Sequence, residues 1–210
     1  MKKIMFSTEY GLQQGVIART KTMTRRVDKK LNHPLVTDIS EWGIDDKGKC
    51  YLTITYSTGL TEDVYPAYQI GEEIAIAQPY KDICLTDPIF FEGMRREAGW
   101  KNKMFVAAEY MPHRIRITDI KVEHLQDISD EDCLREGIFE DAEEHGGLYT
   151  TPFYDFVGND GDGFATPREA FAALIDRVNG RGTWQDNPWV VAYTMDLQRA
   201  DGFKEQETNK

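Results

Sequence analysis

The sequence predicts an α+β protein, organised as a small mixed β-barrel with short flanking helices and long loop insertions. Three observations predict this class. Short alternating strands recur along the chain, one helix has a clear apolar face, and the segments between strands are too irregular for repeating βαβ units. With 210 residues, we expect a single domain over residues 1–200 and a polar tail over 201–210.

The expected elements follow from hydrophobic spacing and from turn residues. In chain order they are a helix over 9–20, a turn and strand over 21–27, a loop over 31–48, a strand over 50–57, a short buried strand over 74–77, an irregular insertion over 79–100, a strand over 114–122, a short helix over 129–137, a loop over 141–165, a helix over 167–178 and a strand over 189–197.

The two helices in the C-terminal half have start and stop signals. Ser129 is a suitable N-cap ahead of an acidic first turn, and Gly137 ends that helix. Thr166 as N-cap, Pro167 at the first helical position and Glu169 form a capping box for the next helix, so capping accounts for Glu169 without a ligand. The apolar face of this second helix consists of Phe171, Leu174, Ile175 and Val178.

Composition predicts a cytoplasmic protein with no membrane partner. No apolar stretch is long enough to span a bilayer, and the apolar run at the start is too short for a signal peptide. Cys50, Cys84 and Cys133 are scattered, with no Cys-x-x-Cys pair, which suits a reducing compartment.

The net charge of −11 argues against a duplex-DNA-binding protein. Residues 19–30 nevertheless hold six basic side chains and one acidic one, whereas residues 123–144 are rich in acids. A basic patch on an acidic body fits a small anionic ligand or a short single strand. A solvated basic face paired with acidic neighbours explains the same pattern equally well.

No metal or cofactor is expected. The four histidines form no ligand pair at motif spacing, and no phosphate loop or dinucleotide fingerprint is present. Asp160, Asp162 and Glu169 match positions of a calcium loop, but Gly158 stands where its first carboxylate belongs.

Lys21 and Thr24 are the residues whose chemistry suggests a site. A hydroxyl becomes a useful nucleophile when a neighbouring group takes its proton, and a desolvated lysine can do this because burial lowers its pKa. A spacing of three brings the two side chains together only if a turn precedes the strand. A strand of alternating threonines and basic residues without chemistry is the alternative, and spacing alone favours it.

The run Lys21-Thr22-Met23-Thr24-Arg25-Arg26 after a short helix resembles the signature of ASCH domains, in particular of the longer members found in phages and prophages. Further segments fit in the same order, and the resemblance leaves out residues 30–65, 80–100 and 140–165. The matching segments are 4–8 (IMFST), 68–77 (YQIGEEIAIA), 111–120 (MPHRIRITDI), 125–138 (LQDISDEDCLREGI), 166–176 (TPREAFAALID) and 187–190 (NPWV).

The resemblance implies a PUA-like barrel that recognises RNA or a nucleoside in a cleft against the first helix. Some small family members are amidohydrolases that remove the acetyl group from N4-acetylcytidine with a Lys, a Thr and a Glu. Lys21 and Thr24 match the first two, and Glu136 in the short helix is the counterpart of the third. The candidate substrate-binding residues are Thr22, Arg25, Arg26 and Arg114.

Two other functions fit the same sequence. In one, the protein is an RNA-binding module in which nothing is cleaved. In the other, it is a phage-encoded protein-interaction factor that uses its acidic insertions to mimic nucleic acid or to cover a host protein.

Overall fold

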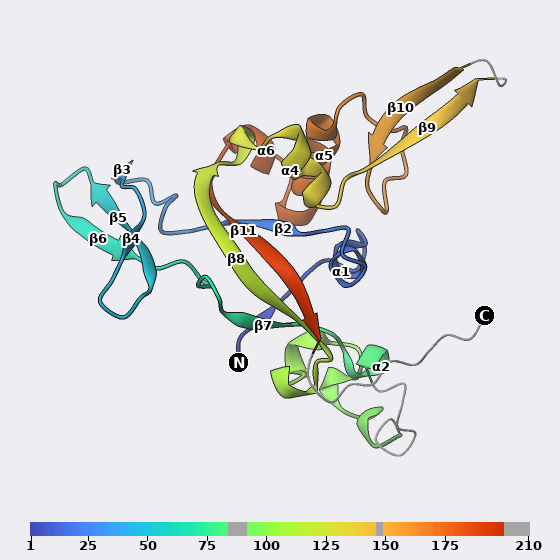
Figure 1. Cartoon of the computed structure of the whole chain (residues 1–210), viewed down its shortest axis with the longest axis horizontal. Coiled ribbons are helices and arrows are strands. Elements are labelled where there is room, and N and C mark those ends of the chain that lie inside the picture. Colours follow the sequence, from blue (N-terminus) through green and yellow to red (C-terminus); the bar gives the residue numbers. More distant parts are fainter. Residues whose placement is uncertain (84–91, 146–148, 200–210) are drawn as a thin grey trace. The chain divides into compact units, whose positions relative to one another are not determined.

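The computed structural model describes residues 1–83, 92–145 and 149–199 (Figure 1). The chain divides into two compact units. Of the described residues, the smaller unit contains those in Met1–Phe6, Glu73–Arg116 and 196–199, and the larger unit those in Ser7–Glu72 and Ile117–Met195. Each unit is described by itself below.

The α+β class is confirmed. Several β-sheets are accompanied by a few short helices, and the described strands form open sheets rather than a closed barrel. The sheet orders are β1-β7-β8-β11-β2, β3-β5-β4 with β6 paired to β5, and β10-β9.

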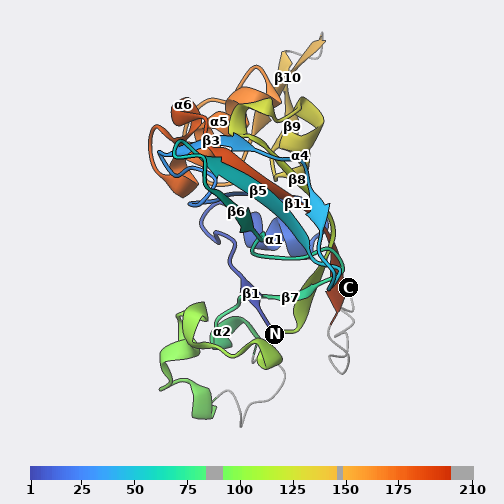
Figure 2. The ribbon, with the colours of Figure 1, turned by 90° about the vertical axis from the view of Figure 1, so that its left-hand side faces the viewer.

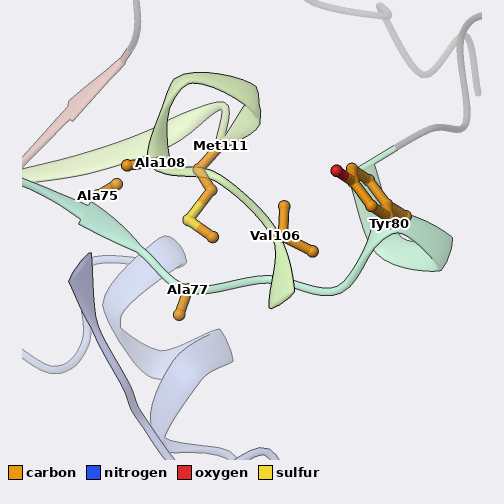
Figure 3. Close-up of a cluster of buried hydrophobic side chains, with 6 residues drawn as sticks. All are labelled: Ala75, Ala77, Tyr80, Val106, Ala108 and Met111. Carbon is orange, nitrogen blue, oxygen red and sulfur yellow. The ribbon is translucent and has the colours of Figure 1, made fainter. Parts of the chain in front are cut away.

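In the smaller unit, short strands support an apolar cluster. Strand β1 (Lys3–Ile4) pairs in parallel with β7 (Glu73–Ile76), which pairs antiparallel with the start of β8 (His113–His124). The helical elements that follow β7 are α2 (Tyr80–Ile83), η1 (Ala98–Trp100), η2 (Lys103–Phe105) and η3 (Ala108–Tyr110). Figure 3 shows the buried side chains that these segments bring together, which are Ala75, Ala77, Tyr80, Val106, Ala108 and Met111.

In the larger unit, two strands and a group of helices position the site. Strand β2 (Met23–Val27) pairs antiparallel with β11 (Trp189–Arg199), and β8 is the next strand of the same sheet. Helix α1 (Leu12–Ile17) precedes β2. The remaining helical elements of this unit are η4 (Leu125–Asp127), α4 (Asp130–Arg135), α5 (Pro167–Asn179) and α6 (Thr183–Asp186).

A second sheet and a hairpin complete the larger unit (Figure 2). The sheet contains β3 (Val36–Ile39), β4 (Gly43–Ile44), β5 (Cys50–Tyr56) and β6 (Thr61–Val64). The hairpin consists of β9 (Phe139–His145) and β10 (Tyr149–Asp155), paired antiparallel.

Most of the predicted elements occur near their expected bounds. The helix over 167–178 is confirmed by α5, whose N-cap Thr166 accepts a hydrogen bond from the Glu169 amide at 3.2 Å. Its apolar face is buried at Phe171, Leu174 and Ile175, whereas Val178 at its end is 40% exposed.

Two predicted loops are wrong. Residues 31–48 contain β3 and β4, and residues 141–165 contain most of the β9–β10 hairpin. In neither segment do apolar side chains alternate regularly along the strands, so the pattern typical of a half-buried strand is missing, and backbone pairing to the partner strand forms the structure instead. The segment 79–100 begins with α2 and ends with η1. Residues 84–91 and the predicted tail lie outside the described residues.

Candidate functional site

A tight turn after α1 places Lys21 ahead of β2. The amides of Thr20 and Lys21 both donate to the carbonyl of Gly15, at 2.9 and 3.0 Å. A Cβ on Gly15 would lie 3.3 Å from Cβ of Lys21, so the missing side chain leaves room for the lysine to pack against the helix. The turn that a shared Lys21–Thr24 site requires is therefore present before the strand, which starts at Met23.

Lys21 forms a buried ion pair with Glu136. Its Nζ lies 2.6 Å from Oε2 of Glu136 and donates a second hydrogen bond to the Glu136 carbonyl, also at 2.6 Å. The side chains are only 2% and 6% exposed. Glu136 is the C-cap of α4, where a cation is favoured over a carboxylate. Lys21 supplies that cation or donor at the helix end, which explains how an acidic residue is accommodated there.

Burial lowers the pKa of Lys21, because the charged ammonium loses its hydration inside the protein. The charge and the hydrogen bond of Glu136 oppose this shift, while the positive charges of Arg26 and Arg25 add to it. A neutral amine has two N–H bonds and one lone pair. Only the deprotonated form of Lys21 has this lone pair and can take a proton, and its two N–H bonds match the two acceptors on Glu136.

Arg25 lies at the centre of a buried network of carboxylates. Its Nε donates to Oε1 of Glu123 at 2.8 Å, Nη2 to Oδ2 of Asp132 at 2.7 Å, and Nη1 to Oε1 of Glu136 at 3.2 Å. The side chain of Arg25 has no exposed surface. Burial acts to lower the pKa of Arg25, but the nearby carboxylates, Glu136 foremost, outweigh it and raise the pKa. Arg25 is therefore a charged hub, and a ligand would reach it only if this network opened.

The two threonines of the motif have different surroundings. The hydroxyl of Thr22 accepts a hydrogen bond from Nε of Arg135 at 3.3 Å, and its amide donates to the Arg135 carbonyl. Thr24 is buried on β2, paired in register with Tyr193 of β11. Because successive side chains of a strand alternate, Thr24 lies on the face of β2 opposite Arg25.

The other two predicted arginines, Arg26 and Arg114, have different surroundings from Arg25. Arg26 is half-buried and lines a cavity of about 460 Å³ together with Asn179 and Asp186. Arg114 belongs to the smaller unit, where its Nη1 lies 4.0 Å from Oε2 of Glu73. Arg114 is therefore a separate candidate and is not placed with Lys21.

The basic stretch 19–30 does not form one exposed patch. Lys21 and Arg25 are buried in the ion pairs described above, and Lys30 pairs with Glu62 at 2.5 Å. Of the two interpretations that the sequence allowed, pairing of basic residues with acidic neighbours accounts for these three side chains.

A cavity of about 410 Å³ lies beside α1 in the larger unit. Its lining residues are mostly apolar and include the close neighbours of the Lys21–Glu136 pair. They are Tyr10, Gly11, Leu12, Gln14, Gly15, Ala18, Thr20, Gly137, Ile138, Phe139 and Val157. Gly137 has a φ of 108° and adjoins Lys21, since a Cβ on it would lie 3.7 Å from Cδ of the lysine.

Nothing in the sequence singles out Glu123 and Asp132. Both belong to an acidic run, and Asp132 is accounted for as a first-turn acid of α4. They lie 98 and 107 residues from Arg25 along the chain. Only the folded arrangement of β2, β8 and α4 shows that they share one guanidinium.

Cys133 is expected to resist alkylation in the native protein. It is fully buried, and burial raises the pKa of its thiol to about 12, so the reactive thiolate is scarce at ordinary pH. Iodoacetamide at pH 8.5 should modify half-buried Cys50 first and Cys133 only in denaturant. Peptide mass mapping would measure both rates, and equal native rates would contradict the burial of Cys133.

The candidate site is a buried Lys–Glu pair held by an arginine hub next to a small apolar cavity. None of the described helices has the length and apolar character needed to cross a membrane. Comparison with family models, curated proteins and solved structures gives no match for this chain.

Proposed function

We propose that the protein binds a nucleoside, or one nucleotide of a short single-stranded RNA, in the cavity beside α1, as an ASCH-type domain with a PUA-like core. One observation carries the proposal. A cavity of about 410 Å³ has as its wall the residues next to a buried Lys21–Glu136 pair. Small-molecule sites typically occupy about 300–1,000 Å³ and combine apolar walls with few polar groups.

The walls of the cavity suit a planar base. Tyr10 and Phe139 both line it, and Phe139 is 40% exposed. Single-stranded nucleic acids are commonly held by stacking unpaired bases on aromatic side chains, and such stacking tolerates an acidic protein better than phosphate binding does. The order of the ASCH-like motifs, with α1 followed by Lys21 and β2, supports the PUA-like assignment.

The binding function can be tested by calorimetry with cytidine and N4-acetylcytidine. Phe139→Ala should weaken binding roughly tenfold, because base stacking on an aromatic ring contributes about 1–3 kcal/mol. Phe105→Ala is the matched control, since Phe105 is 65% exposed and belongs to the smaller unit. Equal affinity of both variants, or no binding by the folded wild type, would rule out this site.

Hydrolysis of an N4-acylcytidine amide is a second candidate, favoured by the hydrogen bonds of Lys21. In this reaction the Thr24 hydroxyl attacks the amide carbonyl while the lone pair of Lys21 takes its proton. The C–N bond then breaks, and the leaving amine receives the proton from Lys21. Water finally hydrolyses the acyl ester on Thr24. Glu136 holds the amine in place through Oε2. The reaction requires the Thr24 hydroxyl and the Lys21 amine to lie together at the substrate carbonyl.

Release of cytidine from N4-acetylcytidine tests this candidate. Thr24→Val keeps the size of the buried side chain and should abolish turnover while leaving cytidine binding intact. Thr24→Ser is the control that retains a hydroxyl. A folded wild type that binds cytidine but hydrolyses nothing is a binding module. A wild type that binds no nucleoside but retains a host protein in pull-downs is an interaction factor.

A further inference from the structure

We propose that Arg25 is a positioning residue, which clamps the Glu136 carboxylate in the one orientation that also holds the Lys21 amine. The expected effect of Arg25 on ligand binding rests on the proposed function. Its geometric basis is independent of any ligand.

The two oxygens of Glu136 are divided between two partners. Oε1 accepts from Nη1 of Arg25 at 3.2 Å, and Oε2 accepts from Nζ of Lys21 at 2.6 Å. A carboxylate held at one oxygen can rotate about its last bond, whereas one held at both oxygens has a fixed plane. Arg25 therefore determines which oxygen faces Lys21.

The guanidinium is itself fixed by its other arms. Nε and Nη2 both lie within 2.8 Å of Oε1 of Glu123, and Nη2 also donates to Asp132. A guanidinium presents its donors in a rigid planar fork, so anchoring two arms sets the direction of the third. The partners come from β8 and from α4. The direction in which Nη1 points is therefore determined by the fold and not by one side chain alone.

Charged groups at the edge of the network hold these anchors in turn. Lys121 of β8, whose side chain is 57% exposed, forms an ion pair with Oε2 of Glu123. Arg135 contacts Oδ1 of Asp132 at 3.3 Å. Arg26 adds a positive charge that acts on Lys21. Each carboxylate around Arg25 thus faces at least two cationic groups, and the charge that Lys21 experiences comes from Glu136, Arg25 and Arg26.

A lysine at position 25 provides the comparison that separates positioning from charge. Arg25→Lys keeps the positive charge but replaces the fork with a single ammonium. The Glu136 carboxylate is then free to turn both oxygens toward Lys21, which favours the ammonium form. We expect the titration midpoint of Lys21 to rise by about one pH unit, a tenfold change in proton affinity.

The measurement uses the full chain with ¹³C-labelled lysine, following the Cε signal of Lys21 against pH by NMR. The signal is assigned as the one missing in Lys21→Met. Arg116→Lys is the matched control, because it makes the same substitution in an exposed ion pair with Glu73, outside the network around Arg25. This variant should show no upward shift. A purely structural Arg25 would lower the stability of Arg25→Lys and leave the Lys21 midpoint unchanged.

If Arg25→Lys does not fold, Glu123→Met removes the partner that anchors Nε and leaves the positive charge of Arg25 in place. Its Lys21 midpoint should also rise, since Nη1 is then no longer held in the direction of Glu136. A folded variant whose midpoint stays within about 0.3 pH units of the wild type would overturn the proposal.

Ligand binding supplies a separate readout. Cytidine affinity should fall about tenfold in Arg25→Lys and remain near the wild-type value in Arg116→Lys. If the Lys21 midpoint moves as expected but the wild type binds no nucleoside, the proposed function fails and the positioning role stands. If the wild type binds cytidine and neither variant moves the midpoint, the positioning role fails alone.

Discussion

Replacing Arg25 with alanine is expected to lower the free energy of unfolding by about 3–5 kcal/mol, the usual result of removing one partner from a buried ion pair. The loss is large because three carboxylates, on Glu123, Asp132 and Glu136, then lack their shared cation. Lys121 and Arg135 remain near two of them, but each is partly exposed and gives a weaker interaction. Urea unfolding followed by circular dichroism measures the change.

An exposed ion pair of similar length provides the control. Nη2 of Arg116 lies 2.6 Å from Oε1 of Glu73, and the Arg116 side chain is 50% exposed. Exposed pairs contribute about 0–1 kcal/mol, so Arg116→Ala should change the unfolding midpoint little. Comparable losses in the two variants would show that burial does not distinguish them and would contradict the network described here.

Truncating Phe171 to alanine should cost about 3–5 kcal/mol, because it removes a large buried ring and leaves a cavity. Phe171 is 1% exposed on α5 and packs edge-to-face against Trp184 of α6, with ring centroids 6.1 Å apart. Without the ring, α5 loses its edge-to-face contact with Trp184 of α6 and one of its largest buried apolar side chains. Thermal and urea unfolding of the purified variant measure the loss.

Val178→Ala, on the same helix, is the matched control. Val178 is 40% exposed, so a change there removes little buried surface, and the higher helix propensity of alanine works in the opposite direction. The expected change is within about 0.5 kcal/mol. A loss above 2 kcal/mol in Val178→Ala would mean that the C-terminal end of α5 is more deeply packed than the structure shows.

The parts of the fold that the sequence predicts are those whose signals are local. The capping residues Ser129 and Thr166 lie at the helix starts that they predict, and each accepts the expected amide hydrogen bond. The strand around Ile115 and Ile117 alternates as its apolar pattern indicates. These signals work because they depend on neighbours within a few residues.

The hairpin at residues 139–155 was missed because its strands carry many polar side chains. Gly146 and Gly147 were a hairpin signal in the sequence, although they lie outside the described residues. The residues around Arg25 were missed for a different reason. A buried carboxylate and a solvated one look the same in sequence, and only long-range packing decides which acids meet a guanidinium.

The site was predicted in part. Lys21 and Glu136 are 115 residues apart, and their pairing was expected only through the family resemblance, yet the structure joins them at 2.6 Å. Thr24 stays a prediction as a nucleophile, because alternation along β2 directs it away from Arg25. The family motif, and not the spacing of three residues, therefore identified Lys21, and the role of Thr24 is left to experiment.

The pairing of β1 with β7 has a consequence for the order in which the chain can fold during synthesis. Lys3 pairs with Ala75 and Ile4 with Ile76, so β1 has no partner until some seventy further residues have left the ribosome. The intervening chain includes α1, β2 and the strands β3 to β6. Of these elements, only β3 to β6 form a sheet whose strands all lie near one another in the sequence. We therefore expect that sheet to form early on the nascent chain, while the N-terminal strand stays unpaired and accessible to chaperones until β7 emerges.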